Sequence, residues 1–235
     1  MLKNKKVWFA ILTVVPIALV LILHAAGALA RVENRLTDFR YIYFNPGHSF
    51  SEEILLLEID EQSLQKLGQD PIYGRWPWKR NAYVPLLEFV AQFGAQKILF
   101  DVTFFEESPE DEALAAVGEA IPIISHALNF RNEELIETPA VLPDAVRAQA
   151  IPYEGPENVS LGYNKVIYPA REILATLPAA HSVTFHPDPD GVARRSRHLF
   201  RYRDEYYPSL SLAAVAPLIG LQSVSYKGQN LILNT

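Results

Sequence analysis

An uncharged run near the N-terminus constrains this chain most. Val7–Leu23 has no formal charge, and the uncharged stretch reaches Ala30, a length of 24 residues. As an α-helix it would span about 36 Å, enough for a hydrocarbon core of ~30 Å. Pro16 lies inside the run, where a membrane helix tolerates proline better than a soluble helix does. The sequence therefore predicts a transmembrane helix over residues 7–30, after a cytoplasmic basic stub at residues 1–6.

The flanking residues predict how this helix is oriented. Three lysines precede it and no acidic residue occurs before position 31, while Trp8 lies near one end, as an interfacial aromatic would. Positive-inside bias puts the N-terminus in the cytoplasm and residues 31–235 in the periplasm or outside the cell, on a single-pass inner- or plasma-membrane protein. A cleaved signal peptide stays open as the alternative, because Ala28-Leu29-Ala30 resembles a cleavage site.

The rest of the chain has the opposite charge balance. It holds 18 of the 21 basic side chains and all 27 acidic ones, a formal charge of −9. This balance argues against a nucleic-acid partner. The 49% hydrophobic and 20% charged residues are ordinary globular usage and exclude a disordered tail. Because the chain has no cysteine, disulfide scaffolds, thiol catalysis and thiolate zinc sites are excluded as well.

Apolar runs of strand length alternate with helical patterns in the first half of this body. The strands are expected at Ile54–Ile59, Lys97–Phe104 and Ile121–Ala127. The helices between them are expected at Glu61–Leu67, Ala82–Phe93 and Ser108–Glu119. Such a βαβαβ pattern predicts the α/β class, with an open, mainly parallel sheet and flanking helices.

Polar and special residues mark the helix ends. Asp60 and Gly68 are expected to cap the first of these helices, and Gly94 to end the second, with Pro85 confined to its first turn. Ser108 is expected to cap the third, with Pro109 at its first position.

The second half is less regular. Residues 130–180 contain six prolines and predict loops, with short helical pieces around Asp144–Gln149 and Arg171–Thr176. The elements expected after them are a strand at Ser182–Phe185, a tight turn at Asp188–Gly191, a strand at Ala193–Tyr202, a helix at Pro208–Gly220 and a strand from Asn230.

No catalytic motif is found. The sequence lacks G-x-G-x-x-G, the G-x-x-x-x-G-K-[ST] phosphate loop, the G-x-S-x-G elbow and H-E-x-x-H. Of the six histidines only His181 and His186 are near neighbours in sequence. The chain is therefore expected not to be an enzyme and to hold neither a metal nor a cofactor.

Two aspartates are candidate ligand-binding residues. Asp60 and Asp101 end or nearly end the first two expected strands, and the carboxyl ends of strands line the ligand crevice of α/β sheets. Together they could bind a cation, a hydroxylated ligand or each other through a shared proton. For Asp60 the alternative is a helix cap. A buried Asp101 needs a partner, for which Arg80 is the candidate.

Two loops carry further candidates. Trp76-Pro77-Trp78 with Arg80 could form a ligand wall; the alternative is a hydrophobic plug, with Arg80 neutralising Asp60 or Asp101. Asp188-x-Asp190-Gly191 echoes the start of a calcium loop, but Leu199 stands where the closing Glu belongs. A turn followed by an edge strand charged by Arg194, Arg195 and Arg197 is the better interpretation.

Several of these pieces occur in a familiar order. They are ILLLEIDEQSLQKLG, RWPWKR, GAQKILFDVTF, the acidic segment at 108–114, PDPDGVARRSR and YYPSLSLA. From about Leu36 onward the chain resembles the extracytoplasmic sensory domain called CHASE, type two (cyclase and histidine-kinase associated sensory extracellular). The positions that match its recurring motifs are Asp60, Ser63, Trp76, Pro77, Trp78, Arg80, Asp101, Asp190, Gly191 and Arg194, and all but Pro77 and Gly191 are taken as candidate ligand contacts.

The resemblance implies a receptor input module rather than a catalyst. In that family a membrane helix leads to an outside domain, and further membrane helices lead to a histidine kinase, a nucleotide or diguanylate cyclase, or a serine/threonine kinase. The family's domain normally continues past the equivalent of Thr235, so we expect a truncated chain, a split or reduced member, or a domain whose second half comes from elsewhere. A half domain would leave an open sheet edge at Asn230–Thr235.

Three functions are therefore open. The favoured one is a membrane-anchored sensor for an unknown small molecule, in contact with the lipid bilayer and present as a homodimer or in a larger membrane complex. A non-catalytic structural or assembly subunit is the alternative. The third is an exported enzyme with Asp60 and Asp101 as an acid–base pair.

Overall fold

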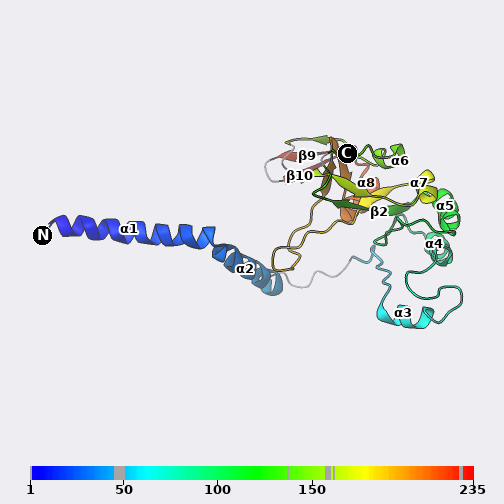
Figure 1. Cartoon of the computed structure of the whole chain (residues 1–235), viewed down its shortest axis with the longest axis horizontal. Coiled ribbons are helices and arrows are strands. Elements are labelled where there is room, and N and C mark those ends of the chain that lie inside the picture. The colour runs from blue at the N-terminus through cyan, green and yellow to red at the C-terminus, as the bar shows by residue number, and fades with distance from the viewer. Residues whose placement is uncertain (1, 45–50, 137, 157–159, 161, 228–229) are drawn as a thin grey trace. The chain divides into compact units, whose positions relative to one another are not determined.

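The computed structural model describes all residues except 1, 45–50, 137, 157–159, 161 and 228–229 (Figure 1). Part of the expected loop region at 130–180 thus lies outside the described residues. The chain divides into two units, Met1–Glu58 and Ile59–Thr235.

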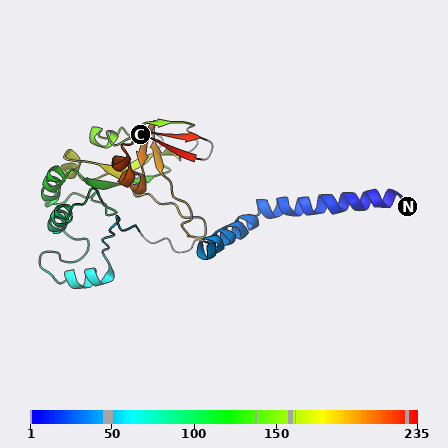
Figure 2. The same ribbon diagram turned by 180° about the vertical axis from the view of Figure 1, so that it is seen from behind.

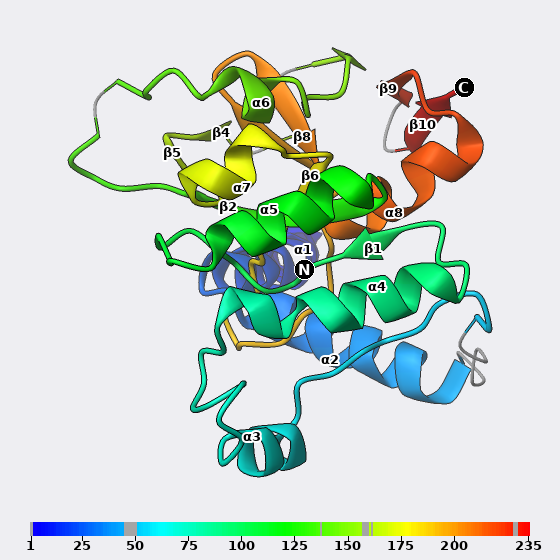
Figure 3. The ribbon, with the colours of Figure 1, turned by 90° about the vertical axis from the view of Figure 1, so that its right-hand side faces the viewer.

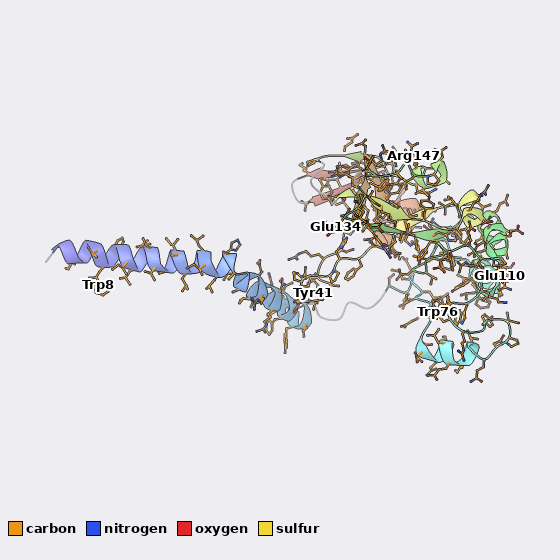
Figure 4. All side chains as sticks on the ribbon, in the orientation of Figure 1. Trp8, Tyr41, Trp76, Glu110, Glu134 and Arg147 are labelled. Atoms are coloured by element: carbon orange, nitrogen blue, oxygen red, sulfur yellow. The ribbon has the colours of Figure 1, made fainter. Side chains whose placement is uncertain are left out.

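The first unit consists of two helices, α1 (Leu2–Ala25) and α2 (Ala28–Phe44). By length and composition Val7–Ala25 can cross a membrane, and its apolar side chains project outward around the helix (Figure 4). Helix α1 ends before Ala30 because Gly27 has a φ of +66°, a left-handed conformation that interrupts an α-helix.

The prediction of a strand at Ile54–Ile59 was wrong. This segment has no regular structure. Its apolar side chains from Ile54 to Leu57 are solvent-exposed, with Leu55 at 77% and Leu56 at 81%, and only Ile59 packs against a buried core cluster. An apolar run supplies strand propensity, but a strand forms only where another strand completes its hydrogen-bond ladder. None of the described strands pairs with this segment.

The helices of the second unit largely follow the sequence pattern. They are α3 (Glu61–Leu67), the 3₁₀ turn η1 (Arg80–Ala82), α4 (Val84–Gln92), α5 (Asp111–Ala120), α6 (Asp144–Arg147), α7 (Arg171–Ala175) and α8 (Leu210–Ile219). The carboxylate of Asp60 accepts from the Ser63 amide at 2.7 Å, as expected of the cap of α3. Gly94 follows α4 and Gly220 follows α8, both with positive φ, so the predicted stops are confirmed.

The strands form three mixed sheets rather than one open parallel sheet. The first contains β1 (Ile98–Leu99), β2 (Ile124–Arg131), β5 (Lys165–Ile167) and β6 (Ala180–Ser182). The second is ordered β10 (Asn230–Asn234), β9 (Ser223–Lys227), β3 (Tyr153–Glu154), and the third β4 (Gly162–Tyr163), β7 (Leu199–Tyr202), β8 (Glu205–Pro208). The α/β class is confirmed, with parallel and antiparallel ladders in each sheet.

The predicted strands are shorter than expected or displaced. Only Ile98–Leu99 of the run at 97–104 pairs, and β2 begins at Ile124 rather than Ile121. No strand is assigned at residues 183–198, so the predicted edge strand from Ala193 begins only at Leu199. The short strands β3, β4 and β5 arise in the expected loop region because partners distant in sequence select them, which a local pattern does not encode.

Two aromatic-rich clusters form most of the core. One contains Trp78, Tyr83, Phe100 and Phe104, and packs around α4 and α5. The other contains Phe130, Tyr163, Phe200, Tyr202 and Tyr207, side chains from β2, β4, β7 and β8. Figure 3 shows α5 alongside α7 on the side of β2 that faces the viewer, and Figure 2 shows the β9–β10 hairpin beside the C-terminus.

A buried ion pair joins the η1 turn to α5. Arg80 Nε lies 3.0 Å from Oδ1 of Asp111, whose side chain is fully buried, and the Arg80 guanidinium lies 4.8 Å from the Phe104 ring centre. The prediction that Arg80 neutralises Asp60 or Asp101 was therefore wrong. Sequence pattern missed Asp111 because it was counted only among the acids that favour a helix start.

The start of α5 also differs from expectation. The Ser108 hydroxyl donates to Glu110 at 2.5 Å instead of capping the helix, and the Ser108 amide donates to Oδ2 of Asp111 at 2.8 Å. Helix α5 therefore begins at Asp111, and Pro109 lies before it rather than at its first position. The carboxylate of Asp111 thus holds both Arg80 and the chain that enters the helix.

Replacing Asp111→Ala should lower the free energy of unfolding by about 3 kcal/mol, because it leaves the mostly buried Arg80 without its counter-charge. Asp144→Ala is the matched control. Asp144 is fully exposed and lies 3.6 Å from Arg147, so its loss should leave the free energy of unfolding almost unchanged. Denaturant unfolding of the full chain in detergent, followed by tryptophan fluorescence, measures both. Equal stability of the two variants would contradict the assignment.

Candidate functional site

The site lies where two parallel strands end. β1 and β6 both run parallel to β2, with Ile98 opposite Ile124 and Ala180 opposite His126. The β1 segment donates backbone hydrogen bonds to the carbonyls of Ile123 and Ser125, whereas the β6 segment bonds to the His126 amide and the Leu128 carbonyl. Because successive residues of a strand point their backbone groups to opposite edges, β1 and β6 lie on opposite sides of β2. The carboxyl ends of parallel strands on either side of a third strand are where α/β proteins place ligands.

A cleft of about 700 Å³ occupies this position. Its lining consists of Asp101, just after β1, residues 182–189 after β6, residues 195–200, the first turn of α8 at 209–211, and Tyr226. An isolated bridge between Ser182 and Ser209 holds the start of α8 beside the end of β6. The prediction that Asp101 lies at a ligand crevice therefore agrees with the geometry, although its role in binding stays a prediction.

A network of ion pairs shapes one wall. Asp188 accepts from Arg194 at 3.1 Å and from Arg195 at 2.8 Å, and Asp190 accepts from Arg194 at 2.8 Å. The Gly191 amide donates to the Asp188 carbonyl at 2.8 Å with a φ of +81°, so the predicted tight turn is confirmed. Hydrogen bonding from Arg194 lowers the pKa of Asp190. Guanidinium groups thus engage both carboxylates of the calcium-like motif.

Two other lining charges have no such partners. Partial burial raises the pKa of Asp101, and no cationic side chain of the described residues lies within 4.0 Å of its carboxylate. Arg197 likewise has no carboxylate within that distance among the side chains that the structure describes. Its charge does act on Tyr163: burial raises the pKa of the Tyr163 hydroxyl, and the positive charge of Arg197 partly offsets that rise.

His186 lines the same cleft and is fixed by a tyrosine. Its Nε2 lies 2.7 Å from the Tyr163 hydroxyl, and the two rings stack with centres 5.8 Å apart. Apolar side chains of the lining, including Phe185, Leu199 and Tyr226, complete walls that are part polar and part apolar. This mixture suits a small polar molecule with a hydrocarbon portion.

His126 of β2 and His181 of β6 are both buried, and the sequence analysis did not single them out. His181 Nε2 lies 2.9 Å from the Phe100 carbonyl, which only accepts, so Nε2 carries the proton. Its Nδ1 then accepts from the Ser125 hydroxyl at 2.8 Å. The neighbouring His126 stacks on Phe100 at 5.5 Å. The available signal was a histidine inside each of two apolar strand-like runs.

Burial keeps both histidines neutral. Desolvation, reinforced by the nearby His181, lowers the pKa of His126 to about 4. Desolvation also lowers the pKa of His181 to about 4, although the hydrogen bond to the Phe100 carbonyl acts in the opposite direction and raises it. His181 is bonded to the carbonyl of Phe100, the residue before Asp101, and directly precedes Ser182, which lines the cleft.

Acid should therefore destabilise the domain below pH ~6.5. Both folded-state pKa values lie below the unfolded value, so the unfolded chain binds more protons; stability is full above pH ~6.5 and falls as the pH approaches 4. At pH 5 the loss is about 2 kcal/mol per histidine. Denaturant titrations at pH 7.5 and 5 measure it. His126→Phe keeps a ring against Phe100 and should remove about half of the difference; an unchanged pH dependence would refute the assignment.

The other predicted contact residues lie outside the cleft. Asp60 and Ser63 cap α3, and the Ser63 hydroxyl and amide lower the pKa of Asp60. Trp78 is buried in the first core cluster, whereas Trp76, labelled in Figure 4, is 45% exposed and meets Trp78 edge to face at 5.4 Å. The plug interpretation thus fits Trp78. Among the described residues no cluster of three or more His, Asp or Glu is placed to hold a metal ion.

Comparison with known proteins identifies the family of this chain. The model of the CHASE2 domain matches residues 14–232, nearly the whole chain. No curated protein and no solved structure shows significant similarity to it. CHASE2 is a family of extracellular sensory domains rather than of catalysts. The apolar helix at Val7–Ala25 is compatible with a single-pass membrane protein. By the extent of the match, this chain belongs to the CHASE2 domain family.

Proposed function

We propose that this chain is the extracytoplasmic input module of a membrane-anchored receptor, which binds a small ligand in the cleft at the ends of β1 and β6. One observation carries the proposal: in a sensory-domain chain, a cleft of about 700 Å³ lies at the ligand position typical of α/β sheets. The output would be a histidine kinase or a nucleotide cyclase, as the family resemblance implies.

A sensor needs two states that its ligand distinguishes. The cleft wall at residues 183–198 joins β6 to β7 without helix or strand. The ion pairs of Asp188 and Asp190 brace its turn, and Thr184 and His186 bond to Phe130 and Tyr163. The opposite wall is the regular start of α8. A ligand that touches both walls would favour their closed arrangement. Because the wall continues into β7, its movement would also displace the β7 side chains in the second core cluster.

Ligand binding is tested by hydrogen exchange on the full chain in mild detergent, with and without a small-molecule extract of the cells that produce it. We expect slower exchange at residues 182–200 and 209–211 when the extract is present. Ser211→Trp, which fills the cleft from an exposed lining position, should abolish this protection. Glu119→Trp, on the exposed surface of α5, is the control and should retain it. No protection in the parent chain would overturn the proposal.

We further propose the orientation with the N-terminus in the cytoplasm and the second unit outside. Because the chain has no cysteine, single-cysteine variants report topology without background. Arg171→Cys, exposed at the start of α7, should react with a membrane-impermeant maleimide in intact cells or spheroplasts. Asn4→Cys should react only after the membrane is permeabilised. The reverse pattern would contradict the orientation.

A structural or assembly subunit remains a second candidate, favoured by one observation. β10 lies at the end of its sheet and pairs only with β9 among the described strands, with Ile232 and Leu233 both 37% exposed. Such an edge can take a strand from a second copy or from another subunit of a membrane complex. Mass determination of the complex extracted in mild detergent separates the two: a kinase or cyclase partner supports the sensor, and a stoichiometric complex without signalling output supports the subunit.

A further inference from the structure

Two opposite charges on the walls of the cleft lack partners in the described structure. Four lining side chains are formally charged: Asp101, Asp188, Arg195 and Arg197. Asp188 and Arg195 neutralise each other at 2.8 Å. That leaves one carboxylate, Asp101, and one guanidinium, Arg197, in the lining of the same cleft, each without a counter-charge within 4.0 Å among the described side chains.

These two charges come from separate elements. Asp101 follows β1, and Arg197 lies in the wall that leads into β7. Partial burial disfavours the ionised form of Asp101, which raises its pKa, and no nearby cation offsets this. A ligand cation at this point would remove the penalty, and a ligand anion at Arg197 would form a charge-assisted pair.

Ligands of a single charge fit less well. An anion that reaches Arg197 would meet the repulsion of Asp101 in the same cleft, and a cation at Asp101 would meet that of Arg197. A neutral molecule would leave both charges uncompensated. The remaining lining is in part aliphatic and aromatic, with Phe185, Leu199 and Tyr226, so a hydrocarbon portion between the charged ends is also accommodated.

We propose that the cleft binds a small zwitterion, an amino acid in the chemical sense, whose ammonium group pairs with Asp101 and whose carboxylate pairs with Arg197. This inference rests on the proposed ligand-binding function and names the ligand class for the same cleft.

The test is calorimetric titration of the full chain in detergent with two probe sets. The first is the twenty protein amino acids; the second is the unbranched series from glycine through 4-aminobutanoate to 6-aminohexanoate, which varies the spacing of the two charges. We expect at least one probe to bind. Its matched amine without the carboxylate, and its matched carboxylate without the amine, should each bind at least ten-fold more weakly.

Two variants test which residue binds each charged end of the zwitterion. Asp101→Asn and Arg197→Gln should each weaken the zwitterion at least ten-fold. Asp101→Asn should leave the matched carboxylate no weaker than before, and Arg197→Gln should do the same for the matched amine. Asp204→Asn and Arg171→Gln, exposed and outside the cleft, are charge-matched controls and should leave all affinities unchanged.

Each outcome decides the inference. It fails if no zwitterion binds, if the amine or the carboxylate alone binds as tightly, or if binding survives both cleft variants. Failure here with extract-dependent protection of residues 182–200 intact would leave a ligand-binding cleft of another chemistry. Loss of that protection as well would remove the proposed function itself.

Discussion

The cross-strand contacts of His181 are the constraint on which the cleft depends. From β6 its ring reaches Ser125 on β2 and the Phe100 carbonyl beyond β1, so one side chain joins the three parallel strands. The bond to the Phe100 carbonyl needs a proton on Nε2, and the neutral ring then accepts from the Ser125 hydroxyl through Nδ1. Asp101 follows Phe100 and Ser182 follows His181 in the chain. The strand ends that position the cleft are therefore held in register by a histidine that burial keeps neutral.

Around this centre the structure separates rigid from adaptable parts. The ion pair of Arg80 and Asp111 fixes the η1 turn to α5, and the two aromatic clusters include buried side chains of the sheets. The long wall at 183–198 has no helix or strand and is held by the side-chain bonds of Thr184 and His186 and by ion pairs at its turn. A ligand that contacts both this wall and the start of α8 would shift a conformational equilibrium only by the difference in its affinity for the two states.

Only part of the candidate site could be predicted from the sequence. Asp101 was singled out because it follows an apolar run, and the structure places it in the cleft. Asp60 followed an equally apolar run, yet the segment before it pairs with no described strand, and the residue caps a helix instead. The difference between the two lies in strand pairing, which depends on residues far away in the sequence. Arg197, His186 and the buried histidines reach the site for the same reason.

The sequence by itself determined the features that depend on neighbouring residues. These are the membrane-length apolar helix, the caps of α3, α4 and α8, the turn at Asp188–Gly191, the α/β class and the family. The tertiary structure alone decided which strands pair, which partner neutralises Arg80, and which charges share the cleft. Helices and turns close their hydrogen bonds within a few residues, whereas sheets, ion pairs and clefts join residues tens of positions apart, where no local pattern records the partner.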